Sequence, residues 1–152
     1  MENIKKTALL SRWMTGIHVC VGIGAIAGGT GAVLNPLSPM GMPPGMLKNG
    51  PFTDFLIPGL FLLCVLGFGN LLAAVALIKK LPFHGMLSGA LGSVLMLWIV
   101  IQCWMLRAVA ALHVIFFLIG AVQGLLALLL LFFLNQFPLD YIRKWLSLKE
   151  KV

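Results

Sequence analysis

Apolar residues fill four long stretches of the chain, and short segments with polar residues, glycine or proline separate them. The stretches cover about residues 13–34, 55–78, 86–106 and 109–134. Each one reaches or exceeds the ~20 residues that an α-helix needs to cross the hydrocarbon core of a bilayer. The pattern predicts an all-α fold, an integral membrane four-helix bundle that forms a single domain over residues 1–152.

Two segments outside these stretches carry patterns of their own. Residues 35–53 contain several prolines, glycines and methionines, which exclude a long regular helix. The segment is also too apolar for a free linker, so we expect an ordered outer loop that folds over the end of the bundle. Apolar and basic residues mix over 138–149 after Pro138, which predicts an amphipathic helix on the inner membrane surface.

The basic residues predict the orientation. Nine of the eleven lysines and arginines lie before the first stretch, between the second and third, or after the fourth. Only Lys48 and Arg107 lie in the other two connections. Because short cytoplasmic loops carry an excess of Lys and Arg, we expect both termini to be cytoplasmic.

Composition excludes a soluble domain. Hydrophobic residues make up 61% of the chain and charged residues 10%, whereas ordinary domains carry about a quarter charged residues. The net charge of +7 would favour nucleic acid as a partner of a soluble protein. In this chain it is better explained by membrane orientation and by attraction to anionic lipids, so no nucleic-acid partner is expected.

Small residues recur every four positions in three of the stretches, which places them on one face of each helix. They are Gly16, Cys20, Gly24 and Gly28 in the first stretch, Gly85 and Gly89 in the third, and Gly120 and Gly124 in the fourth. Small faces let two membrane helices approach closely. We therefore predict tight helix packing at these residues, either within the chain or between two copies.

Polar side chains near the membrane form two predicted layers. The outer layer comprises Asp54, Gln102, Arg107 and His113. Asp54 and Arg107 are expected to form an ion pair, and the layer is either a ligand pocket under the loop or a set of interfacial, turn-locking contacts. In the inner half, His18 is expected to form a hydrogen bond with Asn70, which lies at a similar depth.

Neither histidines nor methionines predict a metal or cofactor. His18 and His113 lie at different depths, so one haem iron cannot take both. Met40, Met42 and Met46 resemble the methionine clusters of copper(I) importers, but no MxxxM motif accompanies them within a stretch. We expect these methionines to fill gaps in the packing.

Residues 50–130 resemble a widespread family of small bacterial four-span membrane proteins of unknown function. The resemblance rests on PF-x-D-x-LIPGL at 51–60, W-I-x-x-Q at 98–102 and LHVIFFLIG at 112–120. In size and span number the chain is also similar to the DoxX-like membrane proteins. At His113 and Val114 it departs from the Gln and Pro expected in the family. The resemblance implies a four-span fold and a bacterial cytoplasmic-membrane location, without an activity.

Three classes of function stay open. The first, which we favour, is a non-enzymatic component that binds a small lipophilic ligand or lipid, or serves as partner subunit of a membrane complex or of a second copy. The second is a transporter or channel component, for which the Gly67, Gly69 and Asn70 cluster is the only hint of a broken helix. The third is a lipid- or quinone-linked enzyme, which needs converging acid–base groups.

Overall fold

The computed structural model describes residues 2–134 and 136, and within them it contains helices and no strand. The predicted all-α fold is confirmed. Four helical segments are long and apolar enough to cross a membrane, and they run over Lys5–Leu34, Leu56–Ile78, His84–Leu106 and Ala111–Leu134. The surface helix expected at 138–149 lies outside the described residues.

The first and second spans differ in detail from the expected stretches. Helix α1 (Glu2–Leu34) begins eleven residues before Trp13, because the basic lead-in consists largely of good helix formers and has no glycine or proline to stop it. The second span joins α2 (Leu56–Phe61), a π-helix η3 (Leu62–Phe68) and α3 (Gly69–Ile78) end to end. The third and fourth spans are α4 (His84–Leu106) and α5 (Ala111–Leu134).

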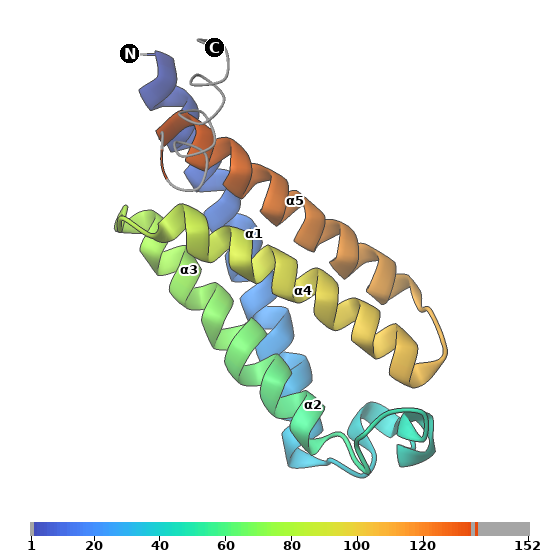
Figure 1. The fold of residues 1–152 in the computed structure, drawn as a ribbon. Helices are drawn as coiled ribbons and strands as arrows, with labels where there is room; N and C mark the ends of the chain where they lie inside the picture. Colours follow the sequence, from blue (N-terminus) through green and yellow to red (C-terminus); the bar gives the residue numbers. More distant parts are fainter. Residues whose placement is uncertain (1, 135, 137–152) are drawn as a thin grey trace, which may run out of the picture.

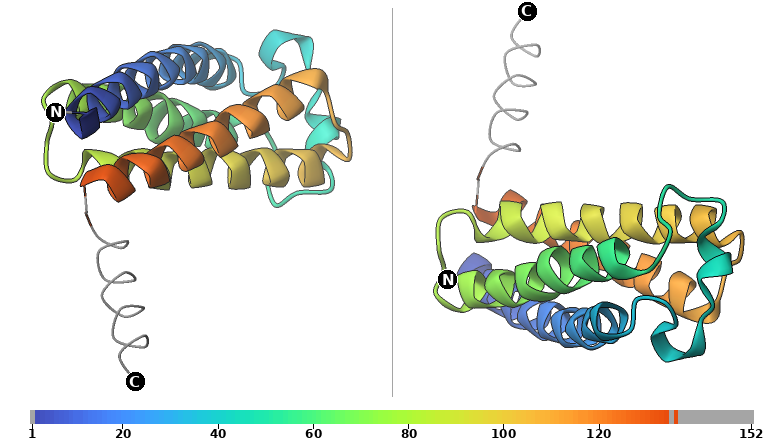
Figure 2. Two further views of the ribbon diagram at one scale, coloured as in Figure 1. Left: turned by 90° about the horizontal axis from the view of Figure 1, so that it is seen from above. Right: turned by 90° about the horizontal axis from the view of Figure 1, so that it is seen from below.

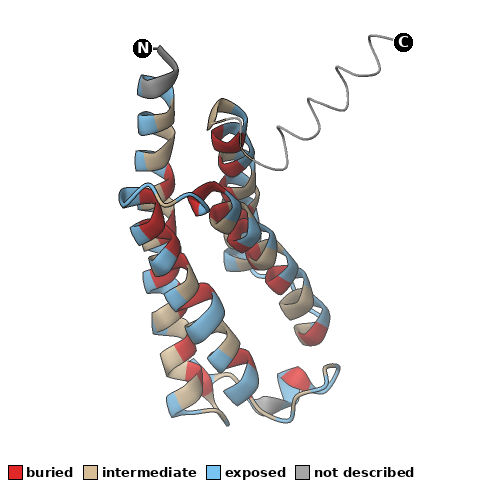
Figure 3. Cartoon of the chain, turned by 60° about the vertical axis from the view of Figure 1, so that its left-hand side comes forward, coloured by how far each residue is buried: buried red, intermediate tan, exposed pale blue. Residues whose placement is uncertain are grey.

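The four spans form two hairpins. Helix α1 packs along α2, η3 and α3, and α4 packs along α5, while α1 with α5 and α3 with α4 join the pairs. The hairpins lie close together where α1 begins and the 79–83 turn lies, which we call the amino end (Figure 1). They diverge toward the opposite end, which holds residues 35–55 and the 107–110 turn and which we call the loop end (Figure 3).

Residues 35–55 cover the loop end of the bundle, opposite the N-terminus (Figure 2). They contain two short 3-10 helices, η1 (Pro39–Gly41) and η2 (Pro44–Leu47). Leu47 is 2% exposed and lies in one apolar cluster with Ala32 and Phe55, against which Leu106 packs. The loop is therefore anchored to α1 and α4 by side-chain burial.

Within each hairpin, the closest helix contacts occur at glycines. A Cβ added to Gly29 of α1 would lie 2.6 Å from the backbone N of Leu63, and one added to Gly59 would lie 2.6 Å from the Cβ of Ala32. Between α4 and α5, a Cβ added to Gly92 would lie 2.8 Å from the carbonyl O of Gly120. No side chain fits at these positions, so glycine permits both hairpins to close.

Most of the predicted packing stripe of α1 is exposed and does not face the other helices. Gly16, Cys20 and Gly24 are exposed, and a Cβ added to Gly16 meets no atom of the described chain within 4 Å. The expected tight packing within the chain is therefore wrong at Gly16 and Cys20, while a Cβ on Gly24 would meet Phe116 at 3.7 Å and one on Gly28 would meet Leu62 at 3.2 Å. A four-residue repeat identifies a face of small residues but contains no information on the direction in which that face points.

The predicted stripes of α4 and α5 do lie at the contact between these helices, with one exception. A Cβ on Gly85 would lie 2.8 Å from Leu131, one on Gly89 3.4 Å from Ala127, and one on Gly120 2.9 Å from the carbonyl O of Gly92. At Gly124 an added Cβ meets no described atom within 4 Å, although its backbone N faces Gly92.

Candidate functional site

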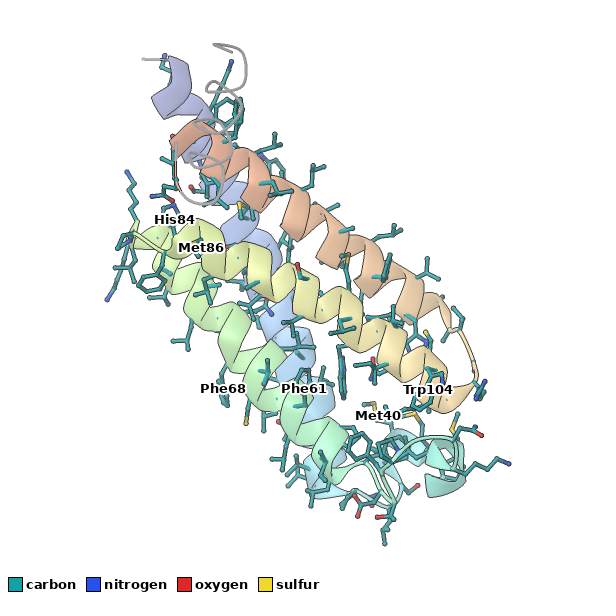
Figure 4. The ribbon with its side chains drawn as sticks, in the orientation of Figure 1. Met40, Phe61, Phe68, His84, Met86 and Trp104 are labelled. Carbon is teal, nitrogen blue, oxygen red and sulfur yellow. The ribbon has the colours of Figure 1, made fainter. Side chains whose placement is uncertain are left out.

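A cavity of about 590 Å³ occupies the loop end, between the diverging hairpins and the loop. All four spans contribute to its wall, and so do the loop and the 107–110 turn. Its lining includes Val21, Ala25, Phe55, Pro58, Leu95, Trp98, Ile99, Leu106 and Phe116, together with the loop methionines Met40, Met42 and Met46. Figure 4 shows Met40 below the diverging helices, on the loop side of the cavity. Side chains thus enclose a largely apolar space at this end.

Two of the four predicted pocket residues line the cavity, Gln102 from α4 and His113 from α5. The Nδ1 of His113 accepts a hydrogen bond of 3.0 Å from the backbone N of Ala110. In the neutral imidazole the proton is therefore on Nε2, which is then a donor. Within the described chain, neither this Nε2 nor the amide of Gln102 has a hydrogen-bond partner.

The third polar group in the wall belongs to Trp98, which is 6% exposed. Its ring stacks on Phe61 with centroids 4.4 Å apart, and its buried Nε1 has no hydrogen-bond partner among the described residues. An indole N–H can only donate. Because this Nε1 is fully buried, it does not face the open space, and the wall offers donors from Gln102 and His113 to an otherwise apolar cavity.

Asp54 and Arg107, the other two predicted pocket residues, do not line the cavity. The expected ion pair between them is absent among the described residues. A carboxylate oxygen of Asp54 instead accepts a 2.9 Å hydrogen bond from the backbone N of Leu56, at the start of α2. Arg107 is exposed and ends α4 with left-handed backbone angles, φ 51° and ψ 31°. Asp54 therefore contributes to the start of α2, and Arg107 to the end of α4.

A second polar group is buried in the interior of the bundle. The structure brings the predicted pair together, with Nδ1 of His18 2.7 Å from Oδ1 of Asn70. Gln123 of α5 completes the group, because its Nε2 lies 2.9 Å from the same Oδ1 and 3.0 Å from Nδ1 of His18. All three side chains are 0% exposed. We call this set the polar cluster.

The geometry of the polar cluster fixes the hydrogen-bond roles. At 2.7 Å from a carbonyl oxygen, Nδ1 of His18 must carry the proton and donate, because two acceptors would repel. Nε2 of Gln123, 3.0 Å from Nδ1, is then a second donor and forms no hydrogen bond with it, and Nε2 of His18 and Oε1 of Gln123 have no partner among the described residues. Gln123 then donates to the same oxygen of Asn70. The amide nitrogen of Asn70 donates over 2.7 Å to the carbonyl O of Leu66, within the π-helix η3. The cluster thus links α1, α5 and the irregular turn of the second span.

Sequence reasoning missed several of these residues. Gln123 was noted in the fourth span but not joined to His18 and Asn70, although its depth along α5 would have placed it at their level. Trp98 and Phe116 line the cavity, and as apolar residues in apolar segments they carry no signal that separates them from lipid-facing neighbours. The loop methionines, which were expected to fill gaps in the packing, also line the cavity.

The described residues contain no group of three or more His, Cys, Asp or Glu side chains placed to hold a metal ion. The two histidines that were weighed as haem ligands belong to different sites, His18 to the polar cluster and His113 to the cavity wall.

Comparisons of the chain with models of protein families, with curated proteins and with solved structures find no match.

Proposed function

We propose that this protein is a multi-pass component of a bacterial cytoplasmic membrane, with both termini in the cytoplasm and the loop end outside. The four apolar helices support insertion. The basic residues support the orientation, since Lys5, Lys6 and Arg12 belong to the first part of α1 and Lys79 and Lys80 to the turn at the amino end. An excess of Lys and Arg is typical of the cytoplasmic side.

We further propose that the protein is a non-enzymatic binder of a small lipophilic molecule, held in the loop-end cavity. The observation that carries this proposal is an apolar cavity of about 590 Å³ with unpartnered polar groups in its wall. Ligand pockets of proteins have volumes of about 300–1,000 Å³, a mainly apolar lining and a few polar groups that orient the ligand. The flexible thioethers of Met40, Met42 and Met46 suit a ligand of irregular shape.

The chemistry of the wall narrows the class of ligand. Among the described residues, no Asp, Glu, Lys or Arg lines the cavity, so a charged ligand would be buried without a counter-ion, which is costly. Donors are available from His113 and Gln102, and an acceptor is available from the Gln102 carbonyl. The expected ligand is therefore a neutral lipophile with an oxygen that accepts hydrogen bonds, such as a hydroxyl, ester or carbonyl group.

Binding is favoured over catalysis because the wall brings together few groups that transfer protons. His113 is the only titratable side chain among the residues that line the cavity. General acid–base chemistry relies on several such groups in defined roles around one reacting centre. A hydrogen-bonding and positioning role for His113 fits the wall better.

A transporter component is the second candidate, and the π-helix η3 is the observation that favours it. Residues Leu62–Phe68 interrupt the second span, and such irregular turns occur often at functional sites. Asn70, however, satisfies the carbonyl O of Leu66 and is 0% exposed, as are His18 and Gln123. Irregular backbone of a transport path lines a cavity. Leu62, the first residue of this turn, does line the loop-end cavity, but the turn packs mainly along α1, so we rank transport second.

The test uses Trp98 as the reporter. In a protein with Trp13, Trp104 and Trp145 changed to Phe, the single remaining indole lies in the cavity wall. A long-chain alcohol with two bromine atoms in mid-chain is titrated into the protein in detergent micelles. We expect saturable quenching of Trp98 fluorescence that the unbrominated alcohol reverses by competition.

Variants connect the quenching to the cavity. Gln102→Leu and His113→Leu should each weaken binding about fivefold to tenfold, because each removes one hydrogen bond to the ligand. Ser93→Ala is the control, since Ser93 is exposed, bonds only to the carbonyl O of Gly89 and does not line the cavity. Quenching that never saturates, or equal affinity in the double variant Gln102→Leu/His113→Leu and the control, would reject the proposal.

A further inference from the structure

Two of the four lateral sides of the cavity are closed by glycine contacts. On the side between α1 and the second span, Gly29 and Gly59 bring the backbones so close that an added Cβ would lie 2.6 Å from its neighbour. Between α4 and α5, the backbones of Gly92 and Gly120 meet at the deeper end of the cavity, about one turn from the lining residues Leu95 and Phe116, and the 107–110 turn joins the two helices at the other end. A molecule in the bilayer cannot pass between helices whose backbones touch.

A stacked aromatic pair closes the third side, between the second span and α4. The rings of Phe61 and Trp98 lie 4.4 Å apart and nearly parallel. Toward the loop, Phe55 continues this closure, in the apolar cluster with Leu47 against which Leu106 packs. Side chains therefore join the two hairpins along this side.

The fourth side, between α1 and α5, is different. The helices meet near the amino end, where His18 contacts Gln123 and where Met14 shares a buried cluster with Ala127 and Leu130. Toward the loop end they diverge (Figure 1), and residues of both helices line the cavity. A Cβ added to Gly24 of α1 would meet one described atom within 4 Å, the Cζ of Phe116 at 3.7 Å. Phe116 therefore lies in this gap, beside Gly24.

The residues at this gap face outward as well as into the cavity. Gly24 and Ala27 of α1 and Leu112 of α5 line the cavity and are all exposed, Leu112 to 65%. All three are apolar, and they belong to helices that are long enough to cross a membrane. The gap therefore opens toward the hydrocarbon of a bilayer. We call it the lateral window.

Building on the proposed binding function, we infer that the ligand is a molecule dissolved in the bilayer, with a hydrocarbon chain and a neutral oxygen-containing head, and that it enters sideways through the lateral window past Phe116. Its head meets Gln102 and His113, near the end of α4 and the start of α5. Its chain extends toward Val21, Ala25 and Leu95 in the deeper wall. The small residues of the α1 stripe provide space for this path, since Gly24 and Gly28 have no side chain that would narrow the window or the cavity.

The alternative path runs over the loop. Met40 of the loop and Ala110 before α5 also line the cavity and are exposed. A water-borne ligand would pass between them. This path leads past thioethers and a backbone turn, whereas the window leads directly from lipid to an apolar wall, so a lipophile is expected to use the window.

The experiment measures rates in membranes. The single-tryptophan protein is placed in phosphatidylcholine vesicles, the brominated long-chain alcohol is added, and quenching of Trp98 is followed by stopped flow. Gly24→Leu fills the window beside Phe116 and should slow quenching at least about tenfold, whereas Phe116→Ala should speed it. Gly16→Leu is the matched control, on the same exposed face of α1 but outside the cavity, and should keep the original rate.

Three outcomes separate the possibilities. Opposite shifts with Gly24→Leu and Phe116→Ala, and none with Gly16→Leu, support the window. Unchanged rates in both window variants, or a rate that responds to Met40→Ala instead, overturn it while leaving ligand binding intact. Absence of saturable quenching of the unsubstituted protein in both micelles and vesicles rejects the binding function itself.

Discussion

The two halves of the bundle hold polar side chains in different environments. Toward the amino end, His18, Asn70 and Gln123 are fully buried and bond at the Asn70 amide, while Nε2 of His18 and Oε1 of Gln123 have no partner among the described residues. At the loop end, Gln102 and His113 line a cavity and hold hydrogen-bonding groups without partners in the described chain. Buried polar groups that are paired fix one arrangement of helices, whereas unpaired groups at a cavity are available to a ligand. The comparison separates the buried polar cluster from the proposed binding site.

The largest loss of stability is expected from substitutions at the glycine contacts that hold the helices of each hairpin together. Gly29→Ala and Gly92→Ala should each lower the free energy of unfolding by about 3 kcal/mol, since the new methyl group meets backbone that cannot yield. The atom nearest to an added Cβ is the backbone N of Leu63, at 2.6 Å, for Gly29, and a backbone atom of α5, at 2.8 Å, for Gly92. Titration with a denaturing detergent in mild micelles measures the change.

The same substitution at other glycines is the control. Gly16→Ala on α1 and Gly124→Ala on α5 place a methyl group where no described atom lies within 4 Å. Alanine is about 1 kcal/mol more favourable than glycine within a helix, so these two variants should keep or raise stability. Equal losses at all four positions would show that the close contacts do not hold the hairpins together.

The next largest change in stability is expected in the polar cluster, and it can be compared directly with the change at a polar residue of the cavity wall. Asn70→Ala removes the acceptor for both His18 and Gln123 and leaves buried donors unpaired, which should cost about 2 kcal/mol. Gln102→Ala, at the cavity, should change the free energy of unfolding by less than about 0.5 kcal/mol. The triple variant His18→Leu/Asn70→Leu/Gln123→Leu should recover part of the loss, because no unpaired donor remains. Equal costs for Asn70→Ala and Gln102→Ala would remove the distinction between the halves.

The sequence predicted the spans well because their signal is averaged over many residues. A run of some twenty apolar positions admits few other structures in a chain with so few charges. The predicted contact between His18 and Asn70 rested on depth, since a helix rises by a fixed amount per residue and polar groups at equal depth seek one another. The same rule could have added Gln123.

Facing directions could not be predicted from the sequence. Spans that are apolar on all sides show no strong difference between the face that meets lipid and the face that meets a neighbour. Gly24 and Gly29 are both small residues of α1, yet one is exposed at the lateral window and the other touches the backbone of the second span. The predicted Asp54–Arg107 ion pair was wrong for a related reason. Two residues at the same end of a bundle can lie on different sides of it.

A smaller effect is expected at the end of α4, where the backbone rather than an ion pair shapes the loop end. Arg107 has φ 51° and ψ 31°, left-handed angles that cost a residue with a Cβ about 1–2 kcal/mol. Arg107→Gly should therefore raise the free energy of unfolding by up to about 1 kcal/mol, with part of the gain lost to the greater freedom of glycine in the unfolded chain. Arg107→Ala keeps the strain and should give no gain. Stabilisation by both variants to the same extent would show that removal of the charge, not relief of the backbone, is responsible.

The smallest expected effect is the coupling between Asp54 and Arg107. Asp54→Ala alone should cost about 0.5–1 kcal/mol, because Leu56 loses the acceptor for its backbone N–H at the start of α2. Arg107→Ala alone should change little, since the side chain is exposed. With no ion pair between the two, their effects should add, and a double-mutant cycle should give a coupling below about 0.3–0.5 kcal/mol. A coupling near 1 kcal/mol or more would mean that the two charges do meet, which would bring both back to the rim of the cavity and make the loop end as tightly tied as the amino end.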